Sequence, residues 1–175
     1  MKLNRLSLIT LFLLASCASY PPIKTVSEVD LDRFMGDWYV IASIPTFIET
    51  EAYNGVETYA INPDGTIATT FTFRQGGFEG ELKTYRPLGF VSEESNAVWG
   101  MQFVWPIKAE YRIIYLDSDY SQTIIGRSAR DYVWIMARTP QIADEDYQKL
   151  LKFIGEQGYD LSKVLKVPQR WSDAR

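Results

Sequence analysis

The stretch Gly36-Asp37-Trp38-Tyr39-Val40-Ile41-Ala42-Ser43-Ile44 gives the first indication of the fold of this chain. From Trp38 onward it is a run of mostly β-branched and aromatic residues, which is typical of a β-strand. We therefore predict a strand over residues 38–44. The short segment 29–35 leads into it, and Gly36-Asp37-Trp38 forms its opening.

The same pattern continues to Arg138, where short β-rich runs alternate with turn residues. Asn62-Pro63-Asp64-Gly65 is a strong turn signal, Gly76-Gly77 suits a hairpin, and Asp117-Ser118-Asp119 suits another. The predicted strands are 38–44, 55–62, 66–74, 78–90, 97–105, 109–117, 121–127 and 131–138. Eight consecutive strands with hairpin spacing predict an all-β fold, an eight-stranded antiparallel up-and-down meander that can close as a β-barrel.

The hydrophobic period changes after the eighth predicted strand. The apolar residues that follow have the spacing of one helical face: Tyr147, Leu150, Leu151 and Ile154. The acidic residues 144–146 suit the start of this helix and Gly158 suits its end. We expect one C-terminal α-helix packed outside the barrel, and residues 161–168 are a candidate for a last short strand.

The amino-acid composition argues against several classes of function. The chain has 175 residues, of which 46% are hydrophobic and 14% aromatic, and this length suits one domain with a substantial core. It has no histidine, which removes the usual general base and the commonest metal ligand. Its single cysteine excludes an internal disulfide and a thiolate zinc cluster. With a net charge of −4, the chain is expected to bind no nucleic acid, and we expect no catalysis, metal or cofactor.

The N-terminal residues have the features of a processing signal. Lys2 and Arg5 precede an apolar run, residues 6–15, that is too short to span a bilayer as a helix. Leu14-Ala15-Ser16-Cys17 follows, and this end of the run resembles the lipobox of bacterial lipoproteins. The resemblance implies that residues 1–16 are a signal peptide and that Cys17 is the lipidation site. The alternative is an ordinary secretory signal with an incidental cysteine.

Residues 17–28 are then the lipidated cysteine and a tether, in which Pro21-Pro22 favours an extended chain. Ala18 follows Cys17, in place of the aspartate that resembles an inner-membrane retention signal. The resemblance therefore implies lipid anchoring in the outer membrane, with the domain in the periplasm or at the membrane surface. Residues 29–171 form that domain, and residues 172–175 are a tail.

Three motifs in the predicted barrel carry a family resemblance: the G-x-W start at Gly36 and Trp38, the Asp119-Tyr120 turn, and Arg138 at the end of strand eight. In this order, with eight strands and a terminal helix, they resemble the lipocalin family over residues 29–171. The resemblance implies that all five residues are structural, with Trp38 closing the barrel base and Arg138 packed over it. A guanidinium stacked on an indole keeps its polar edge free to bond nearby carbonyls.

The run from Arg130 to Pro140, together with the lipobox, looks like the bacterial outer-membrane lipocalins. That subgroup implies a fatty acid or lysophospholipid as ligand, held for storage, transport or maintenance of membrane lipid. One departure is that many lipocalins hold the C-terminal segment by a disulfide. Packing alone must hold that segment here.

Strand alternation predicts which side chains face the barrel interior. If Trp38 and Arg138 face inward, the inward set is rich in aromatic residues and contains few charges. The predicted ligand-binding residues are Glu57, Tyr59, Phe71, Phe73, Met101, Phe103, Trp105, Tyr111, Ile113, Tyr132, Trp134 and Met136. An eight-stranded barrel is just wide enough to be filled by side chains or to hold one small ligand, and composition alone does not separate the two.

Strand direction predicts how a lipid would lie. We expect the acyl tail deep in the barrel, between Met101, Ile113 and Met136, and the head group at the mouth. An ionised Glu57 would repel a fatty-acid carboxylate unless it is protonated or bonded to a tyrosine, which favours lysophospholipid. The connection over residues 45–55 becomes a mouth loop.

Two other classes of function stay open at this point. A structural or assembly lipoprotein would have a filled barrel and a protein partner on its outer face. An enzyme is disfavoured because histidine is missing and the cysteine is used for the anchor. The sequence does not decide whether the chain forms a homodimer.

Overall fold

The structure is a computed structural model that describes residues 21–171. The predicted signal peptide, the lipidation site Cys17 and the tail 172–175 lie outside the described residues, so these remain predictions. Within residues 21–171, no helix is both long enough and apolar enough to cross a membrane.

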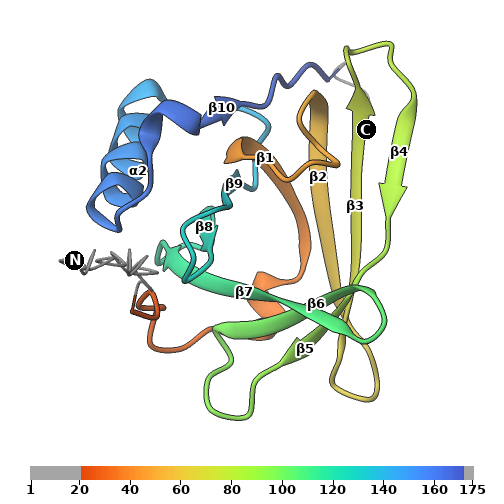
Figure 1. Ribbon diagram of the computed structural model, residues 1–175, viewed down its shortest axis with the longest axis vertical. Helices are drawn as coiled ribbons and strands as arrows, with labels where there is room; N and C mark the ends of the chain where they lie inside the picture. Colours follow the sequence, from red (N-terminus) through yellow and green to blue (C-terminus); the bar gives the residue numbers. More distant parts are fainter. Residues whose placement is uncertain (1–20, 172–175) are drawn as a thin grey trace, which may run out of the picture.

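One antiparallel sheet curls round until its last long strand meets its first (Figure 1). β9 pairs with β1 from Tyr39 opposite Ala137 to Ile44 opposite Val133, and this pairing closes the barrel. The prediction of an eight-stranded up-and-down barrel is confirmed, with β4 and β5 together taking the fourth place. The strands of the wall are β1 (Gly36–Ile44), β2 (Ala52–Ile61), β3 (Ile67–Gln75), β4 (Leu82–Tyr85), β5 (Leu88–Val91), β6 (Val98–Val104), β7 (Ile107–Leu116), β8 (Gln122–Gly126) and β9 (Val133–Ala137).

The fourth barrel strand is broken, so the prediction of one strand over residues 78–90 is wrong. Arg86 and Pro87 separate β4 from β5, because proline has no N–H to donate to a strand ladder. β5 pairs with both β3 and β6, whereas β4 pairs only with β3 among the described strands. The wall beside β4 therefore has an edge on the side that faces β6.

A short helix closes the barrel at one end. α1 (Leu31–Phe34) is capped by Asp30, whose side chain accepts a hydrogen bond from the Arg33 N–H at 3.1 Å. The helix places the Phe34 ring inside the barrel, 5.0 Å from Trp38 and 5.6 Å from Trp99 between ring centres. The Trp38 indole N–H donates to the Phe34 carbonyl at 2.8 Å. Aromatic side chains thus fill the closed end.

Arg138 fastens this end from outside. Its guanidinium lies 3.9 Å from the centre of the Trp38 ring, as the family resemblance implied. It donates to the carbonyls of Arg33, Phe34, Met35, Asp37 and Tyr120 at 2.7–3.3 Å. Gly36 adopts a φ of +91°, which favours glycine, and a Cβ there would lie 3.5 Å from the Arg138 Nη1.

The turn between β7 and β8 depends on a different aspartate from the one predicted. Asp119 is exposed, whereas Asp117 accepts hydrogen bonds from the N–H groups of Ser121 and Gln122 at 2.7 and 3.1 Å. The hydroxyl of Tyr120 accepts from the Asp30 N–H at 2.8 Å and so ties the turn to α1. The structural role predicted for Asp119 therefore belongs to Asp117, because only Asp117 reaches the turn's free N–H groups.

The predicted helix is α2 (Asp144–Glu156), and it buries Tyr147, Leu150 and Ile154 against the outer barrel wall (Figure 1). The chain continues through a 3₁₀ turn, η1 (Leu161–Lys163), to a two-residue strand, β10 (Leu165–Lys166), which pairs with β1. The Gln169 side-chain amide then donates to the carbonyls of Val40 and Gly55 at 2.8 and 3.0 Å. Strand pairing and hydrogen bonds hold the C-terminal segment.

Candidate functional site

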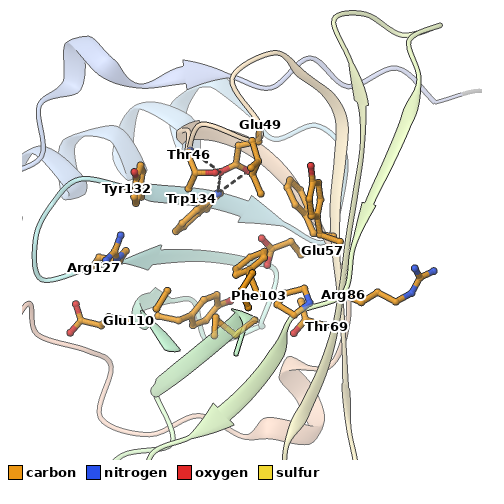
Figure 2. A pocket seen from close by; sticks show the side chains of 18 of the residues that line it. Thr46, Glu49, Glu57, Thr69, Arg86, Phe103, Glu110, Arg127, Tyr132 and Trp134 are labelled. Atoms are coloured by element: carbon orange, nitrogen blue, oxygen red, sulfur yellow. Dashed lines mark hydrogen bonds between the residues drawn. The ribbon is translucent and has the colours of Figure 1, made fainter. Parts of the chain in front are cut away.

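A cavity of about 430 Å³ occupies the half of the barrel away from α1. Cavities of this size are typical of small-molecule sites. Its wall comes from the β1–β2 loop, the break between β4 and β5, and the ends of β6, β7 and β9 (Figure 2). The lining residues are Thr46, Phe47, Ile48, Glu49, Glu57, Thr69, Phe71, Tyr85, Arg86, Pro87, Met101, Phe103, Val104, Ala109, Glu110, Tyr111, Arg127, Tyr132 and Trp134.

Strand alternation placed most of the predicted ligand-binding residues on the correct face. Those that line the cavity are Glu57, Phe71, Met101, Phe103, Tyr111, Tyr132 and Trp134. Those that face inward but lie in the packed interior, away from the cavity surface, are Tyr59, Phe73, Ile113 and Met136. The expectation that an acyl tail lies between Met101, Ile113 and Met136 is therefore wrong for the last two residues, because aromatic side chains fill the barrel around them.

Trp105 is not part of the cavity wall, so its predicted role in ligand binding is wrong. It lies in the turn between β6 and β7 and is 81% exposed. The pairing of β6 with β7 shifts register between Met101 and Val104, so the two-residue alternation that predicted an inward Trp105 does not extend to the turn.

A buried carboxylate that the sequence did not reveal lies in the mouth loop. Glu49 accepts hydrogen bonds from the N–H and the hydroxyl of Thr46, both at 3.0 Å. It also accepts from the Trp134 indole N–H at 3.2 Å, and in Figure 2 this bond joins the loop to β9. Burial raises the pKa of Glu49, while its bonds to Thr46 and Trp134 lower it. No periodic pattern covers an irregular loop, so sequence reasoning had no signal for this residue.

A hydrogen-bonded chain of three polar side chains lies at the floor of the cavity. The Tyr111 and Tyr59 hydroxyls are 2.8 Å apart, and the Tyr59 hydroxyl donates to the Glu57 carboxyl. Trp99 stacks against Tyr111 with ring centres 5.0 Å apart, and Phe34 lies 5.7 Å from Tyr59. These aromatic contacts fix the direction in which the polar groups point.

Burial, together with the negative charge of the neighbouring Glu49, raises the pKa of Glu57 to about 8. Burial, followed by the charge of Glu57, also raises the pKa of Tyr111. At neutral pH Glu57 is therefore mostly a neutral acid, and it is also bonded to a tyrosine. Both conditions remove the predicted repulsion of a fatty-acid carboxylate, so Glu57 gives no reason to prefer a lysophospholipid.

Two buried polar atoms at the cavity wall lack a protein partner. Across the part of the chain that the structure describes, the buried side-chain atoms without a hydrogen bond are the Thr69 hydroxyl and the Arg127 Nε, and both residues line the cavity. The Arg127 Nη1 bonds Asp131 at 3.0 Å, which leaves its Nε as a free donor. Buried polar groups are nearly always satisfied, so these two shielded atoms are the points at the cavity wall where hydrogen bonding is incomplete.

The other charged lining residues are engaged or turned away. Glu110 bonds Arg112 and accepts from the Ser128 N–H at 2.6 Å, and these bonds lower its pKa against the opposing effect of burial. Arg86 is exposed, and Figure 2 shows its guanidinium on the far side of the strands from the cavity. No cluster of acidic or sulfur ligands within residues 21–171 could hold a metal ion.

Comparison with known proteins identifies the family. The family profile described as "Lipocalin-like domain" matches residues 29–169. The chain belongs to the lipocalin family. This lipocalin is 35% identical to temperature-induced lipocalin-1 of Arabidopsis thaliana over 156 residues, which cover 84% of this chain and 83% of the relative. It is 32% identical to the outer membrane lipoprotein Blc of Citrobacter freundii over 161 residues, which cover 90% and 91%.

Solved lipocalin-fold structures agree with the barrel. The cockroach allergen Per a 4 superposes with a TM-score of 0.65 at 17% identity and covers 87% of this chain and 96% of its own. Insecticyanin from the tobacco hornworm Manduca sexta also gives 0.65, at 16% identity, with 88% and 87% covered. At such low identity these likenesses support the fold of the lipocalin alone.

Proposed function

We propose that this lipocalin binds a single amphipathic lipid, a fatty acid or a lysophospholipid, in the open half of its barrel. The observation that carries the proposal is the cavity of about 430 Å³, lined largely by apolar side chains and provided with two unpaired hydrogen-bonding atoms. Shape and apolar lining suit an acyl chain, and the two free polar atoms suit a head group.

The acyl chain would lie against apolar side chains from the mouth loop and the middle of the barrel: Ile48, Phe71, Met101, Phe103 and Trp134. Each buried CH₂ contributes about 0.8 kcal/mol, so a chain of ordinary length provides most of the affinity. The protonated Glu57 adds no charge to this region at neutral pH. The tail is expected above Tyr111, because Trp99 and Tyr59 fill the space beneath it.

The head group would bond the free Nε of Arg127. A guanidinium donor forms a charge-assisted bond with a carboxylate or a phosphate, and such bonds are stronger than neutral ones. Arg127 follows β8 immediately and lies beside Tyr132, whose ring centre is 5.2 Å from its guanidinium. This position keeps the charged part of the ligand at the mouth, where water remains accessible.

We also infer that the protein is held in the outer membrane by acyl chains on Cys17 and that it stores, carries or maintains membrane lipid. The N-terminal sequence supports the anchor, and relatives that are outer membrane lipoproteins support the location. No catalytic step is part of this proposal. The rival function, a filled barrel that serves as an assembly platform, is weakened by the open cavity.

Titration of the protein with palmitate and with a lysophospholipid of equal chain length tests the proposal. Trp134 lines the cavity, so its fluorescence should change in a saturable way. Arg127→Met should weaken palmitate binding about 10- to 100-fold, the loss expected for one charged hydrogen bond. Arg86→Met is the matched control, because the Arg86 guanidinium lies on the far side of the strands and methionine keeps an apolar stem at the cavity wall, so affinity should stay unchanged.

Two outcomes would contradict the proposal. If neither lipid changes the fluorescence or co-purifies with the protein, lipid binding is wrong. If the Arg127 and Arg86 variants weaken binding equally, the placement of the head group is wrong while lipid binding stands. Melting temperatures of both variants control for the lost contact between Arg127 and Asp131.

A further inference from the structure

The open end of the barrel presents large apolar side chains to solvent on two neighbouring turns. Val104, Trp105 and Ile107, at the tip of the β6–β7 hairpin, are 69%, 81% and 70% exposed. Phe47, in the loop between β1 and β2, is 88% exposed. Phe47 and Val104 both border the cavity, so the two turns flank one opening. A concentration of exposed apolar side chains around a binding cavity indicates an interaction surface.

The turns at the closed end expose less apolar surface than those at the open end. The closed-end turns, which join β2 to β3, β5 to β6 and β7 to β8, carry exposed acids: Asp64, Glu93, Glu94 and Asp119. Ile61 is the partly exposed apolar residue beside the first of these turns. The apolar turn tips are therefore a property of the open end and not of the barrel's turns in general.

Exposed acids lie at the open end too: Glu79, Glu81 and Asp131 are ion-paired, whereas Glu51 accepts a hydrogen bond from the Gln75 side chain. The two glutamates of the β3–β4 loop are ion-paired, Glu79 with Arg170 at 2.8 Å and Glu81 with Lys83 at 2.7 Å. Lys108, next to the β6–β7 tip, lies with its ammonium 3.4 Å from the centre of the Phe90 ring. The tip itself, Val104–Ile107, contains no charged residue. Tryptophan with aliphatic neighbours and a flanking lysine is the composition that favours the interface of a bilayer.

The N-terminal segment leaves the domain at this same end. The Pro21 carbonyl accepts a hydrogen bond from the Arg130 Nη1 at 2.6 Å, and the Ile23 N–H donates to the Ser128 hydroxyl at 3.3 Å. Ser128 and Arg130 belong to the turn between β8 and β9, which lies at the open end. Residues 18–20 alone separate Pro21 from Cys17, a reach of at most about 14 Å for an extended chain.

We propose that the open end of the barrel docks on a lipid bilayer, with Trp105 and Ile107 of the β6–β7 tip and Phe47 of the β1–β2 loop entering its interface. The proposal rests on the proposed function, because an acylated Cys17 holds the open end close to the membrane. In this orientation the cavity opens onto the bilayer surface. A lipid passes between membrane and cavity without crossing bulk water.

Quenching of tryptophan fluorescence by brominated lipids tests this orientation. The full chain, as purified from its membrane, is placed in phosphatidylethanolamine–phosphatidylglycerol vesicles with plain or brominated acyl chains. We expect brominated vesicles to quench the wild type and Trp105→Phe to lose most of that quenching. Trp171→Phe, a change on the outer wall beside Tyr39, should keep it. A lipid in the cavity quenches Trp134 equally in all three proteins, so the difference between them isolates Trp105.

A second pair of variants tests the contribution of the apolar tip without removing the reporter. Ile107→Ser should reduce the quenching of Trp105, whereas Ile61→Ser, an equivalent change at the closed end, should not. Equal quenching in wild type and Trp105→Phe, or equal effects of the two serine variants, overturns the docking proposal. The mass of the purified chain reports the acyl group separately, so loss of the anchor and failure of the docking surface are distinguishable.

Discussion

Replacing Glu57 with glutamine should flatten the dependence of stability on pH. The folded chain holds the Glu57 proton up to a pKa of about 8, whereas the ordinary value is 4.5. Between these values the folded state retains a proton that the unfolded state releases. The stability that this group contributes is therefore fully present below pH 4.5 and is lost as the pH rises through about 8. The free energy of unfolding should fall by about 1.4 kcal/mol for each pH unit in that interval, close to 5 kcal/mol over the whole of it.

The assay is urea unfolding followed by tryptophan fluorescence at closely spaced pH values across that interval. Glutamine keeps an acceptor for the Tyr59 hydroxyl but does not titrate, so the difference between the two proteins isolates Glu57. Glu49 is present in both and its contribution cancels. Glu93→Gln, at an exposed turn position, is the matched control. Its free energy of unfolding should depend on pH as that of the wild type does. If the free energies of unfolding of the wild type and of Glu57→Gln differ by the same amount at every pH, the reasoning is refuted.

The remaining predictions concern the scaffold, the ligand and the anchor. Trp38→Ala should lower the free energy of unfolding by about 3–5 kcal/mol, because a fully buried indole is lost. Arg138→Ala should also lower the melting temperature, since the guanidinium that bonds five carbonyls is lost, and neither variant should change the preference between lipids in a titration. Palmitate binding should weaken above the pKa of Glu57, where two negative charges meet in the cavity, and Glu57→Gln should abolish that weakening. Cys17→Ala should abolish metabolic labelling with a palmitate analogue, and label that persists would contradict the lipobox interpretation.

The barrel and its helix were predictable because each rests on a local pattern. Runs of β-branched and aromatic residues between turn signals gave the strand order, and the spacing of Tyr147, Leu150 and Ile154 gave α2. The break between β4 and β5 was also visible in principle, because Pro87 interrupts a continuous strand. Treating residues 78–90 as one strand ignored that signal.

The depth of each side chain in the barrel was not predictable. The alternation of side chains along a strand predicts which of them face the barrel interior. It does not predict how far along the barrel axis other side chains fill that interior. Ile113 and Met136 face inward as expected, yet Phe34, supplied by α1, and its aromatic neighbours occupy the closed half. Only the three-dimensional contacts of Phe34 show where the cavity ends.

Residues outside regular alternation were missed or misplaced for a related reason. Trp105 lies in the turn that follows the register shift before Val104, and the adjacent Pro106 was the one sequence signal of that turn. Glu49 lies in a loop, where no period applies, and its role comes from Trp134 across the fold. The environment of Glu57 depends on burial and on Glu49, so its protonation could not be read from one strand.

Native mass spectrometry of the purified protein with a cavity-filling variant tests the central claim most directly. Ala109 lines the cavity, so Ala109→Trp fills it, whereas Ala60→Trp makes the same change at an exposed position on β2. Lipid binding in the barrel predicts one lipid on the wild type and on Ala60→Trp, and none on Ala109→Trp. A wild type that carries a protein partner and no lipid, or lipid retained equally by Ala109→Trp, would contradict the claim.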